Sequence, residues 1–172
     1  MDYRKEYEKW LASPALSEDE RAELRALEGN DKEIKARFYG PLEFGTAGLR
    51  GTMYTGLHNM NRHVIRWATQ GFANVIRAEG TEAMQKGVAV CMDCRNHSAE
   101  FARETACVMA ANGIHVRLFE SLRPTPELSF AVREYGCQAG VNVTASHNPK
   151  EYNGYKVYWS DGAQLPPHHA DA

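Results

Sequence analysis

The sequence lacks both a long apolar run and a strong net charge. No apolar stretch approaches the roughly 20 residues that a membrane-spanning helix needs, and the first residues carry no apolar segment of the secretory kind. A formal net charge of -2 over 172 residues gives no reason to expect nucleic acid or a membrane surface as a partner. We therefore expect a cytoplasmic protein without a nucleic-acid or membrane partner.

Cysteine is also scarce, since four cysteines are too few and too scattered for a disulfide scaffold. Cys91 and Cys94 form a C-x-x-C pair, which is compatible with a redox pair or half of a zinc site. No second pair follows to complete a zinc site, and Cys91 lies in an apolar run where a buried cysteine is common. A thiol-redox or metal protein therefore stays open as a minor alternative.

Three common catalytic motifs are absent as well. The chain has no G-x-S-x-G elbow, which argues against a hydrolase of that type. It has neither G-x-x-x-x-G-K-[ST] nor G-x-G-x-x-G, so P-loop and dinucleotide sites are not indicated.

The first 39 residues are rich in charge and carry helix signals. Ser17, followed by three acidic residues, is typical of a helix N-cap with an acidic first turn. Apolar residues from Leu24 to Phe38 recur at helical spacing, and a Gly-Asn-Asp turn divides the segment into two helices. We predict an N-terminal helical arm over residues 1–39 and a separate domain over residues 40–172.

From residue 40 onward, short apolar runs alternate with helical segments. Strands are predicted at 87–92, 114–119, 139–144 and 155–159, a short strand near Arg50, and helices at 61–78, 98–112 and 125–135. Such alternation indicates an α/β domain with a mainly parallel, helix-covered sheet. About ten residues join the last two strands, which suits an antiparallel hairpin better than a crossover. We expect a mixed sheet of four or five strands, with one strand reversed.

Polar loops fall where the predicted strands end. They are Phe44–Arg50, Asp93–Arg95, Arg123–Pro126 and Thr144–Asn153. Ligands of doubly wound sheets bind beyond the carboxyl ends of the strands. Small, hydroxyl and cationic residues are typical of a site that binds an anion such as phosphate.

Ser146 is the most informative residue of these loops, because it follows an apolar strand and precedes a turn-forming Asn-Pro. A phosphoserine carries roughly -1.5 to -2 charges and three acceptor oxygens, so it needs cationic neighbours or a metal. Arg50, Lys150, Lys156 and Arg95 could supply the cations. On composition alone, a plain hairpin loop with solvated lysines explains the same residues equally well.

Three ordered motifs together resemble one family. They are T-A-S-H-N-P at 144–149, N-G-Y-K at 153–156 and F-G-T-A-G-L-R-G at 44–51, supported by D-x-R at 93–95 and P-T-P at 124–126. Over about residues 40–160 the chain resembles the phosphoglucomutase/phosphomannomutase (α-D-phosphohexomutase) family. It looks most like the phosphoglucomutase/phosphopentomutase branch.

The resemblance implies the first domain of a four-domain enzyme, and thus a fragment of a longer chain that is inactive alone. Such enzymes move a phosphoryl group between the 1- and 6- (or 5-) positions of a hexose or pentose phosphate, through a phosphoserine and a sugar bisphosphate. The implied cofactors are Mg²⁺, with its remaining ligands in the second domain, and a sugar 1,6-bisphosphate activator. The implied partners are a sugar phosphate and the missing C-terminal domains. A non-catalytic phosphosugar-binding or regulatory module is the alternative.

The resemblance also assigns roles to single residues. Ser146 becomes the phosphoryl carrier and, through its phosphate, one metal ligand. Lys156 and Arg50 match residues beside the transferred group, and His147 is a candidate acid/base or positioning group. The remaining phosphate-loop residues are Thr46, Asn148, Lys150, Asn153 and Arg95, of which Thr46, Asn148 and Asn153 are expected to shape loops. Asp93 and Arg95 are expected to pair. The plainer alternatives are a solvated Lys156 and a His147 that only caps its loop.

Overall fold

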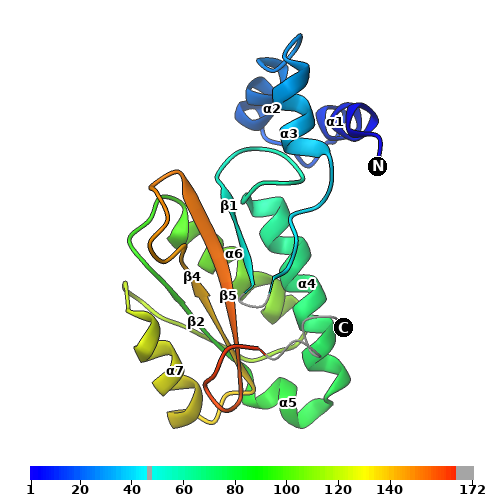
Figure 1. The fold of residues 1–172 in the computed structure, drawn as a ribbon. Helices are drawn as coiled ribbons and strands as arrows, with labels where there is room; N and C mark the ends of the chain where they lie inside the picture. Colours follow the sequence, from blue (N-terminus) through cyan, green and yellow to red (C-terminus); the bar gives the residue numbers. More distant parts are fainter. Residues whose placement is uncertain (46–47, 166–172) are drawn as a thin grey trace.

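The computed structural model describes residues 1–45 and 48–165. Within them the elements follow in the order α1 (Tyr3–Leu11), α2 (Glu18–Arg25), α3 (Asp31–Phe38), β1 (Leu49–Thr52), α4 (Arg62–Ala78), α5 (Thr81–Lys86), β2 (Val88–Met92), α6 (Ser98–Ala111), β3 (Val116–Leu118), α7 (Thr125–Glu134), β4 (Ala139–Val143) and β5 (Tyr152–Trp159). The arm α1–α3 lies at one end of the sheet, and the loop from β4 to β5 lies at the same end (Figure 1). No helix among the described residues is both long and apolar enough to cross a bilayer.

The five strands form one mixed sheet in the order β1-β5-β4-β2-β3. β2 pairs in parallel with both β3 and β4, whereas β5 pairs antiparallel with both β4 and β1. The prediction of a mainly parallel sheet with one reversed strand is therefore confirmed. The strand direction reverses at β5, since the loop before it holds no crossover helix.

One face of the sheet carries the main hydrophobic core. α4, α5 and α6 cover this face, and their apolar stripes pack against alternate residues of the strands. Ile65, Ile76 and Met109 are fully buried from the helix side, and Val141 and Tyr155 from the sheet side. The Tyr155 hydroxyl accepts a hydrogen bond from the Thr69 hydroxyl at 3.0 Å, which satisfies the polar end of the ring inside the core.

The opposite face carries a smaller core under α7. Leu128 and Val132 of α7 pack on Ala89 and Cys91 of β2 and on Tyr158 of β5. α7 covers only the middle of this face, over β2 and β4, while β1 lies beyond it at the sheet edge (Figure 1). The part of the face near β1 and the first part of β5 is thus left for polar side chains.

The arm contains three helices, so the prediction of two helices over 1–39 was wrong. The signal for α1 was present and was not used: its aromatic and aliphatic residues recur at helical spacing and pack, partly buried, on the core of the arm. Its N-cap is clear in the structure: the Asp2 side chain accepts from the backbone N–H groups of Arg4 and Lys5. The predicted Ser17 cap is confirmed, and with Glu20 it forms a full capping box.

The arm packs on the domain through its own apolar cluster and a few ion pairs. Leu24 and Phe38 lie in this cluster together with Leu57 of the domain. The Glu20 carboxylate accepts from the Arg62 guanidinium at 2.6 Å, across the boundary between arm and domain. These contacts fix the arm against the domain, while the boundary predicted at residue 39 stays a prediction.

Candidate active site

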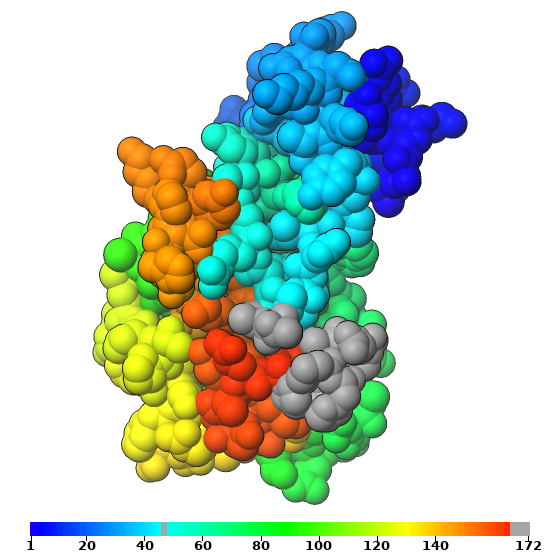
Figure 2. All heavy atoms as spheres, in the orientation of Figure 1, coloured from blue at the N-terminus to red at the C-terminus, as the bar shows by residue number. Residues whose placement is uncertain are grey.

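The loop that joins β4 to β5 displays Ser146 at the surface. Ser146 has φ 58°, in the left-handed region that a residue with a side chain rarely adopts. Its backbone N–H donates to the Thr144 hydroxyl at 3.0 Å, and its own Oγ lies 3.5 Å from His147 Nδ1. The serine and histidine side chains are both exposed, and Figure 2 shows the loop (orange) standing out from the surface. The loop therefore offers a hydroxyl group that a second molecule can reach.

Arg95 holds this loop through its backbone. Its guanidinium donates to four carbonyl oxygens of the loop, those of Ser146, Asn148, Pro149 and Tyr152, at 2.7 to 3.1 Å. Its Nε lies 3.4 Å from the Asp93 carboxylate, so the predicted pairing of the two residues is confirmed. With its donors engaged in this way, Arg95 shapes the loop rather than offering a free cation to a phosphate.

A second set of hydrogen bonds anchors the end of the loop. The Asn153 amide donates to the Ser98 hydroxyl and to the Asn96 carbonyl, both at 3.0 Å, and its Oδ1 accepts from the Gly154 N–H. Ser98 in turn donates to Asp93 at 2.8 Å. The loop-shaping role expected of Asn153 is consistent with these contacts.

Ser98 is the first residue of α6 and not its N-cap, although a serine at the start of a predicted helix is a typical cap. His97, in a left-handed conformation, precedes the helix, and the buried Ser98 is the first helical residue. Its hydroxyl is used by Asp93 and Asn153 instead of by the helix backbone. Sequence reasoning missed this bridging role because no local spacing links residue 98 to residue 153.

Arg50 and Lys156 project from the sheet face opposite the main core. Leu49 and Tyr155 are register partners in the core, so the residues after them, Arg50 and Lys156, lie on the other face. Burial lowers the pKa of the Lys156 ammonium, and the nearby Arg50 charge lowers it further. A lysine whose pKa is lowered by a neighbouring cation is short of a counter-anion.

Gly48 makes this close approach of β1 to β5 possible. Its φ is 102°, and a Cβ on it would lie 1.8 Å from the Tyr155 carbonyl oxygen. Gly48 also exchanges two backbone hydrogen bonds of 3.0 Å with Gly45. Thr46, predicted as a phosphate-loop residue, lies outside the described residues.

Among the described residues, three cations on the loop and on strands β1 and β5 have no anionic partner. Within the described part of the chain, the side chains of Arg50, Lys150 and Lys156 form no ion pair and no hydrogen bond. The structure does not join any of them directly to Ser146 either, since the Ser146 hydroxyl lies at hydrogen-bond range of His147 instead. Such cations, on the loop itself and on the paired strands β1 and β5, are the groups that a doubly charged phosphate on the Ser146 hydroxyl would need.

A polar cavity of about 260 Å³ adjoins Arg50. Thr52 and Tyr152 also line it, and so do Glu33 and Arg37 of α3, so it continues from Arg50 to the arm. The other predicted loop residue, Asn148, is half-buried, and its Oδ1 is buried without a hydrogen-bond partner. Its backbone N–H closes a turn on the Ala145 carbonyl at 3.1 Å, in line with a loop-shaping role.

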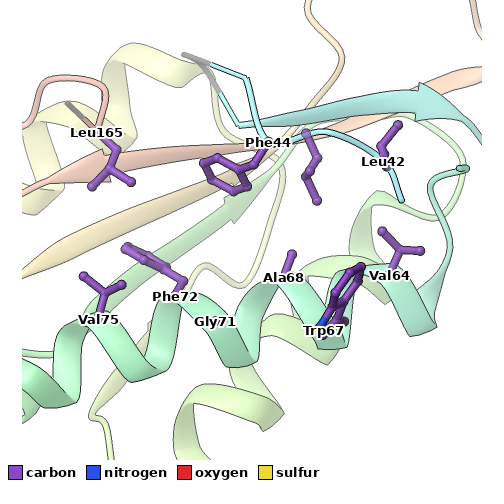
Figure 3. Close-up of a pocket in the computed structure, with 10 residues that line it drawn as sticks. Leu42, Phe44, Val64, Trp67, Ala68, Gly71, Phe72, Val75 and Leu165 are labelled. Atoms are coloured by element: carbon purple, nitrogen blue, oxygen red, sulfur yellow. The ribbon is translucent and has the colours of Figure 1, made fainter. Parts of the chain in front are cut away.

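A hollow lined by apolar side chains lies on the other face. It measures about 230 Å³ and runs along α4, where Phe44, Phe72 and Leu165 converge from three segments (Figure 3). Apolar side chains make up most of its lining, so it offers few groups to recognise a phosphorylated sugar. We therefore place the candidate site at Ser146 and not in this hollow.

The cysteines do not form a second candidate site. All four thiols are free, and burial raises the pKa of Cys91 to about 12. A thiol in that state supplies little of the thiolate that redox chemistry and zinc ligation need. In the described residues, no group of three His, Cys, Asp or Glu side chains is placed to hold a metal ion.

The comparisons with known proteins agree with this geometry. The family described as "Phosphoglucomutase/phosphomannomutase, alpha/beta/alpha domain I" matches residues 41–172. A phosphopentomutase from Homo sapiens is 43% identical over 148 residues, which are 82% of this chain and 24% of that protein. A phosphoglucomutase from Staphylococcus aureus is 43% identical over 136 residues, which are 79% of this chain and 24% of that protein.

The fold has matching relatives among solved structures. A crystal structure described as a phosphomannomutase from Thermus thermophilus superposes with a TM-score of 0.69 at 30% identity, covering 77% of this chain and 29% of that one. The chain spans about a quarter of the length of the curated relatives that it matches. By its sequence and its fold, the chain belongs to the phosphoglucomutase/phosphomannomutase family and corresponds to that family's domain I.

Proposed function

We propose that this chain is the phosphoryl-carrying domain of a phosphosugar mutase and that Ser146 carries the phosphoryl group. The observation that supports it most is the contrast between Arg95 and the other cations of the site. Arg95 is engaged with the loop backbone, whereas Arg50, Lys150 and Lys156 have no anionic partner in the described residues. A phosphate on Ser146 would give these cations the counter-charge that the described residues do not supply.

The proposed chemistry moves one phosphoryl group at a time. A hydroxyl oxygen of the sugar phosphate attacks the phosphorus on Ser146, and the bond from phosphorus to Oγ breaks. The proton of that hydroxyl passes to a base beside the sugar, and Oγ receives a proton from His147, whose Nδ1 lies 3.5 Å away. In the return step Ser146 attacks the other phosphorus of the sugar bisphosphate and gives its proton back to His147. The bond from that phosphorus to the sugar oxygen breaks, and this oxygen takes up the proton held by the base beside the sugar.

The cationic side chains would act on the transferring group itself. The transition state of phosphoryl transfer spreads negative charge over the phosphoryl oxygens, so preorganised cations stabilise it. Lys156 and Arg50 sit on a rigid sheet, which keeps their backbone positions fixed during the reaction. The sugar, whether a hexose or a pentose phosphate, remains to be assigned, since the curated relatives include both phosphopentomutases and phosphoglucomutases.

The Mg²⁺ expected from the resemblance fits this chain only in part. A phosphate on Ser146 would offer oxygen ligands, but the described residues hold no cluster of carboxylates beside it. The rest of the ligand set would have to come from outside this chain, so we route no step through the metal. For the same reason we expect the 172-residue chain alone to show no mutase turnover.

A chimera tests the proposal. This chain replaces the matching segment of the human phosphopentomutase, and the product is assayed for isomerisation of ribose 1-phosphate and glucose 1-phosphate with Mg²⁺ and glucose 1,6-bisphosphate. The proposal expects turnover of at least one sugar phosphate, because the chain would supply a working phosphoryl carrier. The parent enzyme and the chimera with Ser146→Ala are the two controls.

A folded chimera that binds a sugar phosphate but turns over neither substrate would contradict the proposal. That result would favour a phosphosugar-binding or regulatory module that has kept the loop without the chemistry. Binding is measured separately, by calorimetry with each sugar phosphate, so that loss of chemistry and loss of binding are distinguished.

A further inference from the structure

Asn142 is a buried polar residue that the proposed chemistry does not use. It lies in the middle of the sheet on β4 and is 1% exposed. Its Nδ2 donates to the Thr125 hydroxyl at 2.7 Å, at the start of α7. Its Oδ1 is buried without a hydrogen-bond partner, which is costly in a protein interior.

The sheet register places Asn142 beside Lys156. The two residues are direct partners across the antiparallel pair of β4 and β5, so their side chains leave the same face. Such partners have Cβ atoms about 4.5–5.5 Å apart. A lysine side chain is long enough to bring its ammonium to an amide oxygen at that separation. On its other side Asn142 pairs with Cys91, a buried thiol within the small α7 core.

We propose that Asn142 is a positioning residue for Lys156, its amide oxygen accepting a hydrogen bond from the Lys156 ammonium and aiming that ammonium at the phosphoryl group. This inference rests on the proposed function, because it gives Lys156 its direction toward Ser146. The Thr125 hydroxyl can donate or accept, so it does not fix which way the amide faces. The Lys156 ammonium fixes the direction of the amide, since only the oxygen end of the amide attracts a cation.

The link through Thr125 makes the position of Asn142 rigid. Thr125 begins α7 directly after Pro124, whose ring limits the backbone there. Asn142 is thereby held between a helix terminus and a central strand, while Lys156 is half-buried and has Arg50 as a repelling neighbour. A hydrogen bond to this fixed acceptor, which Lys156 does not make in the structure as it stands, would balance that repulsion and restrict the lysine to one direction.

Competitive acetylation of lysines tests the inference on the 172-residue chain. Trace acetic anhydride is added at pH 8, and the rate at each lysine is measured by mass spectrometry. In Asn142→Leu, Lys156 should react roughly three to ten times faster, because the acceptor that stabilises its charged form is gone. Lys150, exposed in the neighbouring loop, should keep its rate.

Asn59→Leu is the matched control. Asn59 is also buried, also donates from Nδ2 to a threonine hydroxyl and also has an Oδ1 without a partner, but it lies outside the strands and is not a register partner of Lys156. Its replacement should leave the Lys156 rate unchanged. Asn142→Ala is the second variant, in case leucine does not fit, and it should give the same increase as Asn142→Leu.

An unchanged Lys156 rate in folded Asn142→Leu and Asn142→Ala would overturn the inference. The acetylation rate is measured without catalysis, so the inference about Asn142 can fail while the mutase proposal holds, and the reverse. If the Lys156 rate does rise, Asn142→Leu in the chimera should lower kcat by roughly the same three- to tenfold factor and leave KM unchanged. A change in KM alone would count against a role in aiming Lys156.

Discussion

The two faces of the sheet differ in the contacts that their side chains make. On the face under α4, α5 and α6, side chains such as those of Val88 and Tyr155 are buried among apolar groups. Even the Tyr155 hydroxyl has a hydrogen-bond partner inside this core. On the α7 face, apolar packing ends at Tyr158, and toward β1 the side chains are Lys156 and Arg50, which have no anionic partner among the described residues.

The difference indicates that one face mainly stabilises the fold and that the other carries the groups for chemistry. Burial of the first face supplies stability, because apolar area removed from water is the main favourable contribution to folding. The second face keeps charges that do not help folding, and unpaired charges of this kind are common at functional sites. Substitutions on the first face should therefore change stability, and substitutions at the polar end of the second should change chemistry.

Ser146→Ala should produce the largest effect on chemistry with the smallest on folding. In the chimera, turnover should fall to near background because no hydroxyl is left to carry the phosphoryl group. Ser146 is exposed in a polar loop, so the free energy of unfolding should change by less than about 0.5 kcal/mol. Steady-state assays and urea denaturation measure the two quantities. A Ser146→Ala variant with a much lower free energy of unfolding but normal turnover would contradict the role of Ser146 as the phosphoryl carrier.

Lys156→Ala should come next, lowering phosphoryl transfer by about 10²–10³. The reason is the loss of one preorganised charge beside the transferred group. Lys86→Ala is the control, because Lys86 lies on α5 and pairs with the exposed Glu82. Single-turnover rates of the chimera compare the two. Equal rates in both variants would leave Lys156 as a solvated strand residue.

Ile76→Ala should destabilise the first face by about 2–5 kcal/mol, because it empties a fully buried position on α4. Where the variant is folded, the acetylation rate of Lys156 should match that of the parent chain. Urea denaturation gives the stability. If the lysine rate changes in the folded variant, the two faces are not independent and the comparison does not hold.

Thiol labelling should give the smallest effect, a difference in rate within one chain. Cys94 is exposed and should react with Ellman's reagent at pH 8 within the mixing time or shortly after. Cys91 should stay unlabelled until unfolding, because burial raises its pKa to about 12. Rapid labelling of both, or a disulfide between them, would support the redox alternative and would show that the small α7 core is open.

The sequence was enough to predict the sheet and the loop that carries Ser146. Strong apolar runs such as Val88–Met92 and clear cap signals such as Ser17 can be recognised without the fold, because local chemistry decides them. The reversed strand followed from the length of the loop between β4 and β5. That strand begins at Tyr152, three residues before the predicted 155, because the end of the loop already pairs with β1.

The remaining features depend on contacts between distant residues. The short helix α5 was not predicted, since it buries little apart from Ala83. The use of Ser98 by Asp93 and Asn153, and the four carbonyls held by Arg95, require the folded loop. Asn142 was missed because an asparagine in a strand carries no sequence signal until the register shows its partner, Lys156.

Intact-mass spectrometry of the chimera tests the central claim most directly. The protein is incubated with glucose 1,6-bisphosphate and Mg²⁺, its mass is measured, and its peptides are mapped, with the Ser146→Ala variant in parallel. The account predicts the gain of one phosphate, located on Ser146 and absent from the variant. Phosphate on Thr144 or His147 instead, or a folded chimera that gains none, would contradict it.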